Sequence, residues 1–278
     1  MKKLSWILCI VVLLGAVWVT TLFVGWRRPT SKAYDHGLTI MTYNTHRMGM
    51  FAKPDKNRVL LYLQRQNADV VCLQEVEVYK EKKYLTLSEL KESMSKYPYT
   101  YFDFSVYNKR RQFGNVVFSK YPLINKQTIR YASRSNISSR CDIVVGDDTL
   151  RLITNHLESN RVEHIDSTTV DKLGAARTIR HNQAKAIRGA RRESPYPLLI
   201  VGDFNDIALS YTYLTIRGWM RDCYLESNLG GIGNTYERHH LGVRIDYILC
   251  SRCLHPTECH VEHVRHSDHY PIVATIKW

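Results

Sequence analysis

The stretch IVGDFND, Ile200–Asp206, ends an apolar run with two carboxylates and an amide placed around one phenylalanine. The residues just before it, PLLIV at 197–201, have the length and aliphatic character of a buried strand. One interpretation of the polar end is an ordinary turn, because glycine, aspartate and asparagine are common turn residues. The other is that a strand carries oxygen ligands to a reaction centre. The rest of the chain distinguishes the two.

Strand-like and helix-like segments alternate along the chain. Apolar residues at helical spacing predict helices over residues 54–67, 85–96, 170–192 and 211–217. β-rich apolar runs predict strands over residues 38–44, 69–75, 99–107, 115–123, 141–157, 197–206, 244–251 and 271–278. The run 141–157 contains Gly146-Asp147-Asp148 and reads as a hairpin, which needs antiparallel pairing. A purely parallel sheet is therefore excluded, whereas two sheets packed together under helices fit the pattern.

The first 32 residues differ from the rest. Residues 4–26 carry no charge and exceed the roughly 20 residues that cross a bilayer as a helix. A cleaved signal peptide is the alternative, but its apolar region is usually about 7–15 residues and ends in small residues, which this stretch lacks. We predict one transmembrane helix within residues 1–32 and one catalytic domain over 33–278. The short N-terminus favours a single-pass membrane protein whose domain is extracytoplasmic.

The predicted domain is basic. Five of the 39 Lys and Arg, and none of the 26 Asp and Glu, precede Ala33, which leaves 34 against 26 and a net charge of +8. The excess is concentrated at residues 108–112 and 177–192, although the second run can also be a solvated helix face. A basic surface favours anionic partners, namely nucleic acid or acidic lipid headgroups.

Six of the seven cysteines lie outside the predicted helix. An even number in an exported protein permits disulfides and leaves a Cys253–Cys259 bridge open. Cys250 and Cys253, followed by Cys259 and two histidines, superficially resemble metal ligands. The second pair of ligands that a structural zinc site requires is missing, so we do not predict zinc.

Polar side chains that can bind metal or phosphate recur at the ends of the predicted strands. They are Asn44, Glu75, Asn155, His156, Asp203 and Asn205, with Asp268 and His269 just before the last strand. Each alone can be a turn or surface residue. Asp246 is more informative, because an aspartate between Ile245 and Tyr247 must find a partner if it is buried. An ion pair with Arg244 is the alternative, since residues i and i+2 share one face of a strand.

The ordered motifs TYN, LQE, GNVVFSKYPL, NHLES, GDFND, RIDYIL and SDHYPI resemble the endonuclease/exonuclease/phosphatase superfamily, which has the deoxyribonuclease I-like fold. The similarity runs from Leu38 to Trp278. Each motif alone is common, but their shared order is specific. The resemblance implies a four-layer α/β/β/α sandwich of two packed mixed sheets, with the active site in a cleft at one edge. It also implies a phosphoester hydrolase that depends on Mg²⁺ or Mn²⁺.

The resemblance assigns the metal and the water to particular residues. Glu75 matches the acidic metal ligand, with Asn44 and Asp268 near the same ion. Hard oxygen ligands and retained waters are what magnesium prefers. Asp203 matches the residue that positions or deprotonates the attacking water, and Asn205 the donor to a phosphoryl oxygen.

Further roles follow from the same resemblance. His269 matches the histidine near the scissile phosphate, and Asp246 matches its carboxylate partner, which would hold the tautomer and raise the basicity of the ring. His156 matches a second phosphate-facing histidine. Asn115 lies in a glycine-asparagine turn that borders the cleft, so we expect it to bind substrate.

We therefore expect water to attack phosphorus in line, activated by Asp203 and His269. The fold does not choose the substrate, but the basic domain favours nucleic acid over a lipid headgroup or an inositol phosphate. A membrane-tethered phosphate-binding protein that has lost catalysis is the other alternative. Such a loss would leave a gap at Glu75, Asp203 or His269, and the sequence has none.

Overall fold

The computed structural model describes residues 34–49, 52–133, 135–160, 167–228, 231, 233–238 and 241–278, together with 10, 12, 13 and 15–17. Its first sheet has the strand order β13-β14-β1-β2-β4-β3. Only β1 and β2 pair in parallel. The strands are β1 (Gly37–Asn44), β2 (Val70–Tyr79), β3 (Tyr99–Tyr107), β4 (Arg111–Ser119), β13 (His255–Val261) and β14 (Ile272–Lys277).

The second sheet has the order β5-β6-β7-β8-β12-β9, and only β7 and β8 pair in parallel. Its strands are β5 (Leu123–Arg130), β6 (Ile137–Val145), β7 (Asp148–His156), β8 (Leu198–Asp203), β9 (Arg221–Asp222) and β12 (Asp246–Cys250). A separate two-stranded hairpin consists of β10 (Tyr236–Arg238) and β11 (Leu241–Val243). Both sheets are therefore mixed, and the predicted hairpin supplies the antiparallel pair β6–β7.

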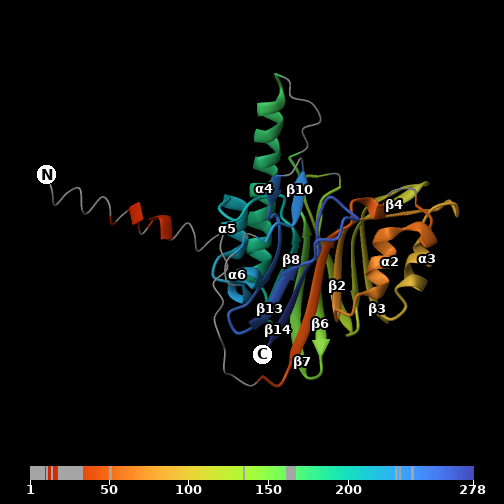
Figure 1. Cartoon of the computed structure of the whole chain (residues 1–278), viewed down its shortest axis with the longest axis horizontal. Coiled ribbons are helices and arrows are strands. Elements are labelled where there is room, and N and C mark those ends of the chain that lie inside the picture. Colours follow the sequence, from red (N-terminus) through yellow and green to blue (C-terminus); the bar gives the residue numbers. More distant parts are fainter. Residues whose placement is uncertain are drawn as a thin grey trace.

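Helices cover the outer face of each sheet (Figure 1). Helices α2 (Arg58–Arg65) and α3 (Leu87–Ser93) pack on the first sheet. Helices α4 (Thr169–Arg192) and α5 (Tyr211–Arg217) pack on the second, and α6 (Cys223–Ser227) lies beside β12 and β13. Two short 3-10 turns, η1 (Arg47–Gly49) and η2 (Pro54–Lys56), follow β1. The predicted α/β sandwich of two packed mixed sheets is confirmed.

Strand periodicity explains why the central strands contain continuous apolar runs. In β8, Leu199 and Val201 point into the core between the sheets, whereas Leu198 and Ile200 pack under α4 and α5. Strand β2 divides in the same way between the intersheet core and the core under α2 and α3. Strands buried on both faces lose the polar alternation of a half-exposed sheet, and the polar groups inside them, such as Glu77 and Asn115, need buried partners.

Several local predictions are confirmed and two need correction. The hairpin pairs Val145 with Asp148, and the predicted helices 170–192 and 211–217 correspond to α4 and α5. The helix predicted over 54–67 begins only at Arg58, because the Asn57 side chain caps it by accepting from Leu60 N. Strand β2 continues past Glu75 to Tyr79, four residues beyond the predicted end.

The predicted transmembrane stretch, residues 4–26, lies largely outside the described residues, and the anchor stays a prediction. None of the helices among the described residues is long and apolar enough to span a membrane. The six cysteines from Cys72 onward are all free thiols. A Cys253–Cys259 bridge is not formed, since Cys253 is exposed and Cys259 is buried.

The end of β8 depends on a glycine. Gly202 has φ +115°, and a Cβ there would clash with the carbonyl oxygen of Asn155 and lie 2.8 Å from its nitrogen. We expect Gly202→Ala to lower the free energy of unfolding by more than about 2 kcal/mol, measured by chemical denaturation. Gly189→Ala is the control, because no atom lies within 4 Å of its added Cβ. It should be neutral or stabilise by up to about 1 kcal/mol. Equal stability of the two variants would contradict the clash.

Candidate active site

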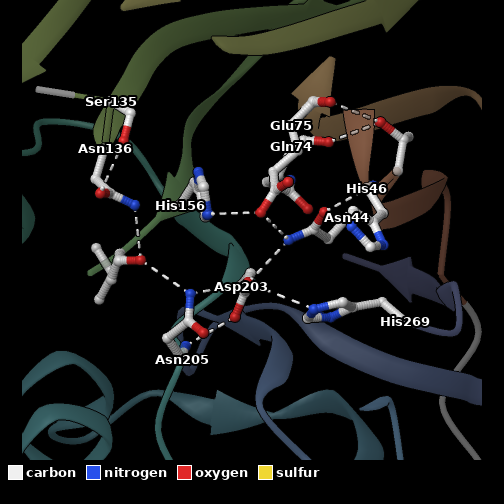
Figure 2. Close-up of polar contacts among 12 residues, drawn as sticks. Asn44, His46, Gln74, Glu75, Ser135, Asn136, His156, Asp203, Asn205 and His269 are labelled. Atoms are coloured by element: carbon white, nitrogen blue, oxygen red, sulfur yellow. Dashed lines mark hydrogen bonds and ion pairs between the residues drawn. The ribbon is translucent and has the colours of Figure 1, made fainter. Parts of the chain in front are cut away.

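A cavity of about 680 Å³ opens where strands of both sheets end. Its walls include the carboxylates of Glu75, Asp203 and Asp268 and the ring of His269. Glu75 belongs to β2 of the first sheet, Asp203 ends β8 of the second, and Asp268 and His269 lie in the loop before β14. Figure 2 shows the side chains of Glu75, Asp203 and His269 gathered around the Asn44 amide. Groups distant in the sequence therefore share one pocket.

Glu75 sits at an irregularity in β2. Its φ is 52°, a left-handed conformation that is uncommon outside glycine, and the pairing of β2 with β4 shifts between Leu73 and Val76. The Thr45 hydroxyl donates to the carbonyl oxygens of Gln74 (3.0 Å) and Glu75 (3.1 Å), which holds this bulge. The bulge places the Glu75 side chain on the cavity wall while β2 continues beyond it.

The Glu75 carboxylate is held in its charged form. His156 Nε2 lies 3.3 Å from Oε1, and Asn44 Nδ2 donates to the same oxygen at 3.4 Å. Burial alone would raise the pKa of Glu75, but the hydrogen bond and charge of His156 and the Asn44 amide together lower it to about 2. Burial would likewise lower the pKa of His156, yet Glu75 raises it. Each partner thus favours the charged form of the other at the pocket edge.

Asp203 is buried and accepts hydrogen bonds on both oxygens. Asn44 Nδ2 and Asn205 Nδ2 each donate to Oδ2 at 3.0 Å, and the Asn205 backbone N–H donates to Oδ1 at 2.7 Å. The φ of Asn205 is 52°, so the chain turns after Asp203 instead of staying extended. This turn brings the backbone and side-chain N–H groups of Asn205 to the Asp203 carboxylate. Burial and the charge of Asp246 raise the pKa of Asp203 to about 6. This carboxylate can therefore exchange a proton near neutral pH.

His269 lies between two carboxylates. Its Nδ1 is 2.9 Å from Asp246 Oδ2, and its Nε2 is 3.9 Å from Asp203 Oδ2. Burial would lower the pKa of His269, but the charges of Asp246 and Asp203 outweigh it and raise the pKa to about 10. The alternative pairing of Asp246 with Arg244 is wrong. Arg244 Nη1 instead donates to Asp222 Oδ2 at 2.6 Å.

The carboxylate oxygens that line the cavity suit a divalent cation. Glu75 and Asp268 both present carboxylates to the cavity, the donor chemistry that Mg²⁺ prefers. Asn44 is arranged differently, because its amide nitrogen bridges Glu75 and Asp203 and its oxygen accepts from His46 N at 3.1 Å. Asp203, Asp246 and His269 also offer atoms within 4.8 Å of one another. His269 already bonds Asp246 there, so this trio is better suited to holding a proton.

Comparison with known proteins decides the family. The model of the Endonuclease/Exonuclease/phosphatase family matches residues 41–269. The chain belongs to this family. No curated protein matches it.

Solved structures share the fold of this Endonuclease/Exonuclease/phosphatase family member. A family protein from Beutenbergia cavernae DSM 12333 is 19% identical, with a TM-score of 0.67 over 87% of this chain and 71% of the other. Truncated TDP2 from Caenorhabditis elegans is 16% identical, with a TM-score of 0.64 over 89% and 100%. A family protein from Bacteroides vulgatus is 16% identical, with a TM-score of 0.63 over 87% and 99%. At such identities the likeness shows the fold alone.

Of the residues expected from the family resemblance, Glu75, Asp203, Asn205, Asp268 and His269 line the cavity. Asn44, His156 and Asp246 lie behind its wall and contact these residues, whereas Asn115 does neither. Asn115 is fully buried and does not line the cavity. Its amide donates to Ile137 O and Ser139 Oγ, both at 3.2 Å, and so joins the two sheets. Its position therefore gives no support to substrate binding. The Gly-Asn motif marks a buried intersheet contact in this member of the family.

Sequence reasoning missed His46 and Tyr236, which also line the cavity. His46 Nδ1 lies 3.1 Å from Asp268 Oδ1, and the Tyr236 ring lies 4.8 Å from that of His269. His46, Arg47 and Met48 all have positive φ, a left-handed turn that no sequence pattern in THRMG indicates. The position of His46 two residues after the TYN motif was the only available signal.

The charge state of His269 can be measured directly. We expect its imidazole to remain doubly protonated well above pH 8 and to titrate near pH 10, followed by ¹⁵N chemical shifts. Asp246→Asn should lower the midpoint by more than about one pH unit, because it removes the adjacent negative charge. Asp55→Asn changes an exposed aspartate outside the cavity and should leave the titration midpoint of His269 unchanged. Titration of His269 below pH 7 in the unmodified chain would refute the assignment.

Proposed function

We propose that this chain is a divalent-metal-dependent phosphodiester hydrolase, with nucleic acid as its favoured substrate. Family membership supports the broader class of metal-dependent phosphoester hydrolases. The observation that carries the proposal is the convergence of Glu75, Asp203 and His269 on one cavity. Each comes from a different segment of the chain, namely β2, the end of β8 and the loop before β14. An inactive binding protein would have no need of a proton acceptor with a pKa raised towards neutrality.

Asp203 takes the proton of the attacking water. A general base works best when its pKa is near the operating pH, and the pKa of Asp203 is raised to about 6. The amides of Asn44 and Asn205 fix the direction of the carboxylate. As the water oxygen bonds to phosphorus, its proton passes to Asp203 and the P–O bond to the leaving alkoxide breaks.

His269 acts as a cation, not as a second base. With its pKa raised to about 10, the ring carries positive charge at neutral pH. Nδ1–H donates to Asp246, whereas Nε2 is 3.9 Å from Asp203, too far for a hydrogen bond. Nε2–H is therefore able to donate to a phosphoryl oxygen and stabilise its developing charge. This modifies the expectation that Asp203 and His269 both activate water.

Glu75 and Asp268 would hold the divalent cation, with Mg²⁺ favoured and Mn²⁺ acceptable. A bound cation supplies positive charge against the negative charge that develops on the phosphoryl oxygens. The net charge of +8 over residues 33–278 supports a polyanionic substrate. Membrane tethering through residues 4–26, with the domain outside the cytoplasm, completes the proposal.

The role of His269 predicts a large kinetic effect. His269→Ala should lower kcat by roughly 10²–10⁴-fold, measured on the full chain in mild detergent with Mg²⁺ and bis-p-nitrophenyl phosphate. His260→Ala removes an exposed histidine outside the cavity and should turn over normally. Plasmid DNA, RNA, sphingomyelin and an inositol polyphosphate complete the substrate panel. Normal turnover by His269→Ala would remove this residue from the mechanism.

The two shifted pKa values predict a bell-shaped pH profile. Activity should rise with pH through about 6 as Asp203 loses its proton, and fall through about 10 as His269 loses its charge. In Asp246→Asn both limbs should move to lower pH, because Asp246 raises both pKa values. Exhaustive chelation should abolish activity, and Mg²⁺ or Mn²⁺ should restore it. A profile unchanged in Asp246→Asn, or full activity after chelation, would contradict the proposal.

A further inference from the structure

Two more cavities continue from the catalytic one. The second, of about 470 Å³, shares His46 and Asp268 with the catalytic cavity. The third, of about 320 Å³, shares His266 with the second. Because each cavity has a wall residue in common with the next, the three lie side by side along one face. Together they lead from the scissile position, past the loop before β14, to α2.

The sign of the charge reverses along these cavities. Glu75, Asp203, Asp206, Glu237 and Asp268 make the wall of the catalytic cavity acidic. The walls of the second and third cavities contain the arginines Arg47, Arg58, Arg65 and Arg265, and among the residues assigned to these walls Asp268 is the only acid. The first cavity is suited to a cation and one phosphate, whereas the next two are suited to anions alone.

The positive charge in these cavities is only partly neutralised. The buried carboxylate of Glu77 pairs with both Arg47 and Arg111, so that trio keeps one net positive charge. Arg58 and Arg65 form no ion pair with any residue that the structure describes. Unpaired arginines in a recess raise the local concentration of anions, and their planar groups bind phosphate oxygens in pairs.

Helix α2 presents these arginines in a regular row. Arg58, Leu61, Tyr62 and Arg65 all line the third cavity, at the i, i+3, i+4 and i+7 spacing of one helix face. Leu60 and Leu63 point the other way into the core. Seven residues of α-helix separate the two arginines by about 10 Å along the axis. The row therefore extends well beyond the reach of a single phosphate bound at the catalytic residues.

We propose that the second and third cavities form a binding track for the phosphates of a nucleic-acid strand whose scissile phosphate lies in the catalytic cavity. The inference rests on the proposed function and adds the site that selects a chain over a small phosphodiester. Arg265 at the second cavity and Arg58 and Arg65 at the third are the phosphate contacts. A strand fits better than a bilayer, because the arginines line a recess. It also fits better than an inositol phosphate, whose groups lie too close together to follow the track.

Binding of oligonucleotides tests the track independently of turnover. The probes are fluorescein-labelled (dT)₁₂ and (dT)₂, measured by anisotropy with the full chain, in the His269→Ala background with Mg²⁺. Arg58→Gln/Arg65→Gln/Arg265→Gln should weaken (dT)₁₂ binding at least tenfold and leave (dT)₂ binding within twofold. The slope of log Kd against log salt should fall by about 2, since each single-strand phosphate contact contributes about 0.7.

The control variant removes the same number of positive charges at positions outside the track. Arg130→Gln/Arg252→Gln/Lys277→Gln removes three exposed cations outside these cavities and should alter the slope by less than half as much. Equal losses in both triple variants would show general charge attraction and overturn the track. No loss in the first triple variant would also overturn it. Loss of binding to phosphatidylserine vesicles without loss of (dT)₁₂ binding would assign these arginines to a lipid surface instead.

Failure of the track and failure of the proposed function have different readouts. The proposed function fails if the unmodified chain does not hydrolyse bis-p-nitrophenyl phosphate or any diester of the panel. The track fails if oligonucleotide affinity does not depend on Arg58, Arg65 and Arg265, whatever the rate of hydrolysis.

Discussion

Three carboxylates buried at the open edge of two sheets are the constraint on which the site depends. Glu75, Asp203 and Asp246 are each at most 9% exposed, and uncompensated buried charge is too costly to retain. His156 compensates Glu75, and His269 lies between the other two. Asn44, at the end of β1, donates to Glu75 in its own sheet and to Asp203 in the other. The two sheets must therefore keep a fixed position relative to each other, because a shift would separate the charged groups from the partners that compensate them.

Backbone strain is concentrated where these charges meet. Positive φ values occur at Glu75, at Asn205 and in the turn His46–Met48, all beside the cavity. Such conformations cost of order 1–3 kcal/mol each and persist only when the surroundings enforce them. Here the surroundings are a rigid sandwich with strands buried on both faces. The core therefore maintains a geometry that the local sequence disfavours, and the carboxylates stay aimed into the pocket.

Charge is distributed unevenly around this rigid centre. The catalytic cavity is acidic, which suits a cation but repels a free phosphate chain. Basic side chains begin just outside it, in the left-handed turn after β1 and on the exposed face of α2. Under the proposed function, a substrate with many phosphates would gain attraction from the basic region that offsets its repulsion by the acidic cavity. The position of these arginines next to the acidic cavity, and not the net charge alone, connects the basic composition of the domain with its chemistry.

The sequence alone located several of the reactive groups, because Asn44, His156 and Asp203 each follow an apolar run as the last residue of a strand. It also determined α4, α5 and the β6–β7 hairpin, whose periodicity and turn residues are local. Tertiary structure decided the partners. Asp203 meets Asn44 across 159 residues, and Asp246 meets His269 instead of the nearby Arg244. It also buried Asn115 and placed His46 at the cavity, because long-range packing, not local pattern, sets which charges share a pocket.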